Sequence, residues 1–114
     1  MVVETYAQNA VVVDLPPLPE AIDEFEAVIE IACDRRNCDV VIDFSRVDII
    51  NSQCIALLLA MHAWLTQSGR RLILSSVCGA VKRVFEVIGL DEVFEFTPDK
   101  SMALKQVHRS PSAS

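Results

Sequence analysis

Two short segments, VVIDF at residues 40–44 and LILSS at 72–76, constrain the fold of this chain most strongly. Both are apolar at consecutive positions, as expected of strands that are covered on both faces. Between them, residues 53–67 have the composition and length of a helix, and Gly69 follows where a helix-ending glycine is expected. Parallel strands need a crossover connection of this kind, so the pattern predicts adjacent, parallel, central strands.

The rest of the chain continues the alternation of strands and helices. VVETY and AVVVDLP predict two strands joined at Gln8-Asn9, and Ile22, Phe25, Ile29 and Ala32 recur at the spacing of an amphipathic surface helix. A helix over 81–88 ends at Gly89, VFEF at 93–96 is the last predicted strand, and Thr97 is the expected cap of a C-terminal helix. This order predicts an α/β layered domain with a largely parallel central sheet.

Composition excludes several classes of function. The chain has 114 residues, 52% of them apolar, which fits one domain with a core, and its net charge of −6 is concentrated in the first half. Such an acidic half argues against nucleic acid as a partner. The longest apolar run, CIALLLAM, is too short to span a bilayer, so we expect a cytoplasmic protein without direct membrane insertion.

No motif points to a cofactor or a metal. GxxxxGK[ST] and GxGxxG are absent, the two histidines are not at a ligand spacing, and the four cysteines contain no CxxC pair. We expect the cysteines to be small buried residues. An enzyme that uses Cys54 is a distant alternative, because a helix N-terminus lowers the pKa of a thiol.

The corner at Asn51 and Ser52 is the candidate site. A serine or asparagine at a helix start is ordinarily a cap, but a hydroxyl at the carboxyl end of a central strand also lies where α/β sheets place ligands. The helix N-terminus favours an added phosphate, so Ser52 is a candidate phosphorylation site.

The helix after this corner has more apolar surface than one buried face needs. We expect Leu58, Leu59 and Leu65 to face the sheet. Ala56, Ala60 and Ala63 form a stripe of small residues, which fits either a partner surface or tight packing within the domain.

From residue 40 the sequence resembles the STAS domain, a family named for sulfate transporters and anti-sigma factor antagonists. The resemblance rests on VVIDFSRVDIINSQCIALLLAMHAWLTQSGRRLIL and VKRVFEVIGLDEVFEF; it covers residues 40–97 well and the first 39 poorly. In that family a strand leads through an Asp-Ser-Ser-Gly corner into a helix. The family's phosphorylated serine falls on Ser52, its aspartate on Asn51, its next Ser or Thr on Gln53, its glycine on Cys54, and two later small positions on Ala56 and Ala60.

The resemblance implies an α/β, STAS-like single domain with a central, mixed and mostly parallel β-sheet and helices packed on one side. We expect this domain over residues 1–109 and a flexible tail at 110–114. The resemblance also implies a non-enzymatic anti-sigma factor antagonist that binds an anti-sigma factor serine kinase and is switched by phosphorylation at Ser52. Partner contacts are implied for Asn51, Ser52, Gln53, Cys54, Ala56 and Ala60. The alternative is a STAS accessory subunit that is not phosphorylated and binds a membrane transporter.

Overall fold

The computed structural model describes residues 2–7, 10–17, 23, 26–27, 39–99, 101–103 and 105. Within them, five strands form one sheet: β1 (Val2–Ala7), β2 (Ala10–Asp14), β3 (Asp39–Asp43), β4 (Leu72–Ser75) and β5 (Glu95–Thr97). The strands lie in chain order; β1 is antiparallel to β2, and the other pairs are parallel. The prediction of a mixed, mostly parallel sheet with β3 and β4 adjacent at its centre is confirmed.

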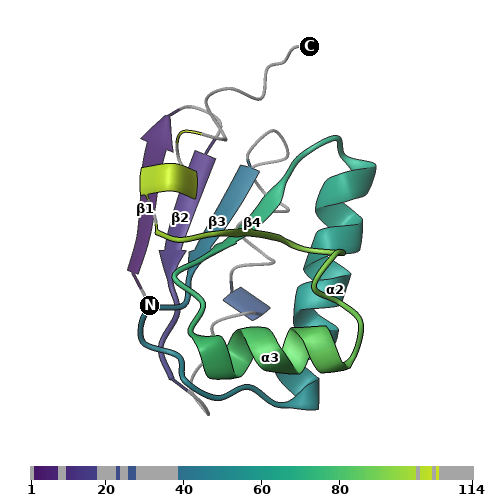
Figure 1. Cartoon of the computed structure of the whole chain (residues 1–114). Helices are drawn as coiled ribbons and strands as arrows, with labels where there is room; N and C mark the ends of the chain where they lie inside the picture. The colour runs from purple at the N-terminus through teal and green to yellow at the C-terminus, as the bar shows by residue number, and fades with distance from the viewer. Residues whose placement is uncertain are drawn as a thin grey trace.

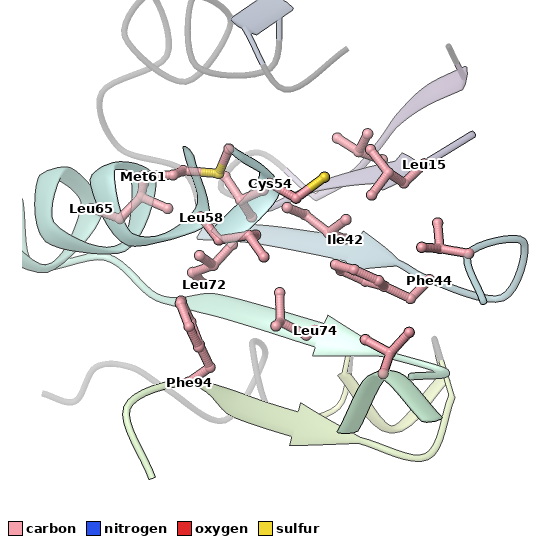
Figure 2. Packing of buried hydrophobic residues seen from close by; sticks show 14 of the residues in the cluster. Leu15, Ile42, Phe44, Cys54, Leu58, Met61, Leu65, Leu72, Leu74 and Phe94 are labelled. Atoms are coloured by element: carbon pink, nitrogen blue, oxygen red, sulfur yellow. The ribbon is translucent and has the colours of Figure 1, made fainter. Parts of the chain in front are cut away.

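Helices α2 (Ser52–Gln67) and α3 (Gly79–Val87) cover one face of this sheet (Figure 1). Side chains of a strand alternate between the two faces, and the inner strands divide accordingly. The helix-covered face holds Val40, Ile42, Leu72 and Leu74, and the opposite face holds Val41 and Ile73. Figure 2 shows Ile42 and Leu72 of this group beside Leu58 of α2.

The opposite face is also covered, by a residue of the C-terminal helical segment. Ala103 is fully buried there and packs with Val12, Val41 and Ile73. The expectation of helices on one side therefore holds for α2 and α3, while residues 101–103 add a helical contact to the second face. This second contact explains why the central strands are apolar at every inner position.

Four residues of α2 face the sheet: Cys54, Leu58, Met61 and Leu65. Their spacing of four, three and four residues places them on one side of a helix with 3.6 residues per turn. The expected inward position of Leu58 and Leu65 is confirmed. The expected inward position of Leu59 is wrong, because Leu59 lies about 100° around the helix from Leu58 and is 36% exposed.

Both helices end at the glycines that the sequence indicated. Gly69 and Gly89 have φ angles of 74° and 81°, a left-handed conformation that costs glycine little. Arg70 N donates to Leu65 O at 2.8 Å, and Leu90 N donates to Phe85 O at 2.8 Å, the long hydrogen bond of a Schellman motif in each case. The helix ends are thus fixed by backbone geometry.

An ion-pair network joins the amino ends of three strands. Buried Asp39 lies 3.1 Å from Arg70 Nε and accepts a 2.9 Å hydrogen bond from Arg71 N. The Arg71 guanidinium donates to both carboxylate oxygens of Glu95, which raises the pKa of Arg71. The Gly-Arg-Arg turn thereby ties β4 to β3 and β5.

Two expectations near the C-terminus are wrong in detail. The last strand is Glu95–Thr97, so Phe94 precedes it and is buried under α2 and α3. The C-terminal segment is capped by Asp99 Oδ1, which accepts from Met102 N at 2.9 Å. Thr97, the expected cap, is a buried strand residue whose hydroxyl donates to Asp99 O.

Several predictions fall mostly outside the described residues: the Gln8-Asn9 turn, the helix near residues 20–34 and the 110–114 tail. In the second of these, the described residues 23, 26 and 27 are helical, and Asp23 and Glu26 are exposed as expected of its outer face.

Candidate functional site

The loop from β3 to α2 is held at its base and exposed at its tip. Phe44 N donates to Ser75 O at 2.8 Å, and Val47 N donates to Phe44 O at 2.9 Å, with both side chains buried. Cys78 Sγ, at the start of α3, lies 3.8 Å from Val47 O. Beyond these anchors Ile49 is 64% exposed. The large apolar side chain of Ile49 is thus exposed to solvent near the corner at Asn51 and Ser52.

Asn51 is the N-cap of α2. Its backbone is extended (φ −128°, ψ 178°), and its Oδ1 accepts a 2.9 Å hydrogen bond from Cys54 N. Asn51 O also accepts the first helical hydrogen bond, from Ile55 N at 3.2 Å. The capping function that the sequence left open between Asn51 and Ser52 therefore belongs to Asn51.

Asn51→Ala should lower the free energy of unfolding by about 1 kcal/mol, because the amide of Cys54 loses its acceptor. Asn51→Asp is the matched control: a carboxylate caps equally well and is favourable at a helix N-terminus, so its stability should match or exceed that of the parent. Urea unfolding of the three proteins measures both effects. Equal stability of the alanine and parent proteins would contradict the assignment of the cap.

Ser52 is the first residue of α2 and is exposed. Because Asn51 caps the helix, the Ser52 hydroxyl is not needed there, and among the described residues it has no hydrogen-bond partner. The first turn of α2 contains no acidic residue. The hydroxyl is therefore accessible, and a negative charge added to it would meet the positive end of the helix dipole.

One face of α2 is exposed along most of the helix. We call it the α2 face; it consists of Ser52, Gln53, Ala56, Leu59, Ala60 and Ala63. It lies opposite the buried side of α2, and α2 has no Asp, Glu, Lys or Arg at any position. Of the two interpretations of the alanine stripe, packing within the domain is thus excluded for the described residues, and an uncharged surface of small residues remains.

Cys54 differs from the other predicted site residues. Its side chain is 1% exposed and packs in the core beside Leu58 and Ile42 (Figure 2). Burial raises the pKa of the thiol, and the hydrogen bond with the Asn51 backbone lowers it less. The premise of a reactive thiolate is therefore wrong, and Cys54 offers no side chain to a partner.

The remaining groups of catalytic interest do not converge. His62 is half-buried and packs edge to face against Phe94, with ring centroids 5.4 Å apart. Cys78 is free and half-buried, whereas Cys33 and Cys38 lie outside the described residues. In the described part of the chain, no three His, Cys, Asp or Glu side chains are grouped to hold a metal ion.

No helix among the described residues is long and apolar enough to cross a bilayer.

A family model described as "Mlab, STAS domain" matches residues 18–104. The chain belongs to the STAS domain family. The match begins before residue 40, so it includes part of the region in which the sequence resemblance is poor. Among curated proteins, no sequence matches the chain at a significant level.

Solved structures share the STAS fold at low identity. The anti-sigma factor antagonist SpoIIAA of Bacillus, in its unphosphorylated form, has a TM-score of 0.75 at 20% identity, covering 95% of this chain and 97% of its own. TM1081 of Thermotoga maritima has a TM-score of 0.78 at 18% identity, covering 95% and 88%. An anti-sigma factor antagonist from Mycobacterium paratuberculosis has a TM-score of 0.70 at 24% identity, covering 94% and 92%.

Proposed function

We propose that this STAS domain is an anti-sigma factor antagonist that binds an anti-sigma factor serine kinase and is switched by phosphorylation of Ser52. The observation that carries the proposal is the exposed Ser52 hydroxyl, which the Asn51 cap leaves without a structural function. Support comes from the structural neighbours described as anti-sigma factor antagonists. SpoIIAA, one of them, has been solved in both phosphorylated and unphosphorylated forms.

The α2 face, together with Ile49 and Asn51 of the preceding loop, is the proposed contact surface. The contacts would come from Asn51, Ser52, Gln53, Ala56 and Ala60, all of which are exposed, and Cys54 is left out because it is buried. Small residues allow close approach of another backbone, and Ile49 adds a large exposed apolar side chain beside them. Cys54, which stands where the family has a glycine, points its side chain into the core and so does not obstruct this surface.

Phosphorylation would act on this surface as a charge switch. A phosphate adds about −1.5 to −2 charges to a helix face that carries none. At the N-terminus of α2 the fold tolerates this charge, but burying it under a partner is costly. The unmodified protein would therefore bind the kinase, and the modified protein would release it.

Ser52→Ala should abolish phosphorylation by the cognate kinase and ATP, seen by mass spectrometry as loss of a phosphate-sized increase. It should bind the kinase like the parent, whereas Ser52→Asp should weaken binding by about tenfold or more because it places a charge in the contact. Both variants should unfold like the parent to within about 1 kcal/mol.

Ser45→Ala is the matched control, because Ser45 is an exposed serine of the preceding loop; phosphorylation should be unchanged. If Ser52→Ala is still phosphorylated, or if the alanine and aspartate variants bind the kinase equally well, the switch at Ser52 is disproved.

The second candidate is an accessory subunit that binds a membrane transporter without phosphorylation. The observation in its favour is Asn51, which replaces the family's aspartate and commits its side chain to the cap. The accessory-subunit function predicts that Ser52 stays unmodified in the cell. It also predicts that transporter subunits, rather than a kinase and a sigma factor, are encoded beside this protein.

A further inference from the structure

Asn51 caps α2 with a neutral side chain, although a carboxylate would suit the end of this helix better. Aspartate accepts the same hydrogen bond, and its negative charge is favourable at the positive end of the helix dipole. The first turn of α2 has no acidic residue either. The two charged side chains of the preceding loop, Arg46 and Asp48, are exposed and opposite in sign. The N-terminus of α2 thus lacks a negative charge to balance its dipole.

Two backbone amides at this end of α2 donate no hydrogen bond within the described part of the chain. Ile55 N donates the first helical hydrogen bond, to Asn51 O at 3.2 Å, and Cys54 N donates to Asn51 Oδ1 at 2.9 Å. The amides of Ser52 and Gln53 come before these two and have no acceptor there. A phosphate on Ser52 Oγ would be attached beside both donors, where an anion is favoured.

We propose that Asn51 determines how phosphorylation of Ser52 changes the stability of the domain. Next to the neutral Asn51, the phosphate supplies the negative charge that the helix N-terminus lacks and stabilises the fold. Next to a carboxylate at position 51, the two like charges on neighbouring residues would repel each other, and the gain would be lost. The inference rests on the proposed phosphorylation of Ser52 and adds a positioning residue to its regulation.

This stabilisation would serve the proposed switch. A domain that releases its partner loses the stability that binding supplies. The phosphate that causes the release would replace part of that stability at the N-terminus of α2. The phosphorylated, unbound form would therefore be more stable than the unmodified, unbound form.

Four full-length proteins test the inference: the parent and Asn51→Asp, each with serine or phosphoserine at position 52. The phosphoserine is incorporated during translation with an expanded genetic code, so the test needs no kinase. In the parent, phosphoserine should raise the midpoint of thermal unfolding by about 2–6 °C at low ionic strength, and by less at high ionic strength. In Asn51→Asp the increase should disappear or become a decrease.

The order of stability of the two sequences is the most specific readout. Without phosphate, Asn51→Asp should be at least as stable as the parent, because its carboxylate caps the helix and balances the dipole. With phosphate, it should be the less stable of the two. A cap with a structural function alone would give the same order in both states. Asn51→Ser, another neutral cap, should keep the increase caused by phosphoserine, and it serves as a second test if Asn51→Asp does not fold.

Phosphoserine at position 45 is the matched control. Ser45 is exposed in the loop before α2, but its amide already donates to Asp43 Oδ1 at 2.9 Å. A phosphate there would lie near a carboxylate instead of unpaired amides, so the midpoint should not rise.

The inference is overturned if phosphoserine at position 52 does not raise the midpoint of the parent, or if it raises that of Asn51→Asp equally. An equal rise from position 45 would also overturn it, because the effect would not be specific to the helix N-terminus. Failure of the proposed function looks different: a kinase that leaves Ser52 unmodified would disprove the switch without changing any of these midpoints.

Discussion

Leu58→Ala should lower the free energy of unfolding by about 2–5 kcal/mol, because it leaves a cavity between α2 and the sheet. Leu58 is completely buried and belongs to the cluster that also contains Ile42 and Leu74. Domains of this size are stable by only about 5–15 kcal/mol. The midpoint of thermal unfolding should therefore fall by about 10 °C or more.

Leu59→Ala is the matched control, since it makes the same chemical change at the adjacent position of the same helix. Leu59 is 36% exposed on the α2 face, so the expected loss is below about 1 kcal/mol. Thermal and urea unfolding of both variants measure the difference. Similar losses for the two variants would mean that the orientation of α2 differs from the one described here.

The sheet could be predicted because its signals are local and redundant. In β3 and β4, consecutive apolar residues indicate strands covered on both faces, and the helix between them requires parallel pairing. Gly69 and Gly89 mark helix ends because few other residues adopt the left-handed backbone of a Schellman motif. These features were predicted correctly without knowledge of any tertiary contact.

The errors lie where two residues compete for one function. Thr97 and Asp99 are both good caps, and the strand pairing of Thr97 with Ser75 decides the outcome. Leu58 and Leu59 are equally apolar, but one helix face can accommodate only one of them. Such choices depend on packing across the whole domain, which a single sequence does not reveal.

The candidate site was predicted in position but not in detail. The corner at Ser52 followed from the strand-helix order and from the STAS resemblance. The burial of Cys54 agrees with the expectation for the cysteines, but its place among the partner contacts came only from the resemblance, which compares it with a glycine that has no side chain to orient. Ile49 was missed because an exposed isoleucine looks like a core residue in sequence. An isoleucine two residues before a helix cap is the available signal.

Ala60→Glu should abolish capture of the proposed kinase partner while leaving the domain folded. Ala60 is exposed at the middle of the α2 face, and glutamate is a good helix former, so the free energy of unfolding should change by less than about 0.5 kcal/mol. In the complex, the carboxylate would be buried without a partner, which costs about 2–5 kcal/mol and corresponds to about 30-fold to several thousand-fold weaker binding. Calorimetric titration with the kinase measures the loss.

Ser101→Glu is the control, because it adds the same charge to an exposed residue of the segment that packs on the opposite face of the sheet. It should bind the kinase like the parent. Together with Leu58→Ala, the pair separates surface from core on a single helix: Leu58→Ala should destabilise the fold, and Ala60→Glu should destroy only binding. If Ala60→Glu loses its cooperative melt, the alanine stripe is part of the core. If it remains folded and still binds the kinase tightly, the α2 face does not contact the kinase, because an unpaired buried charge at its centre could not be accommodated.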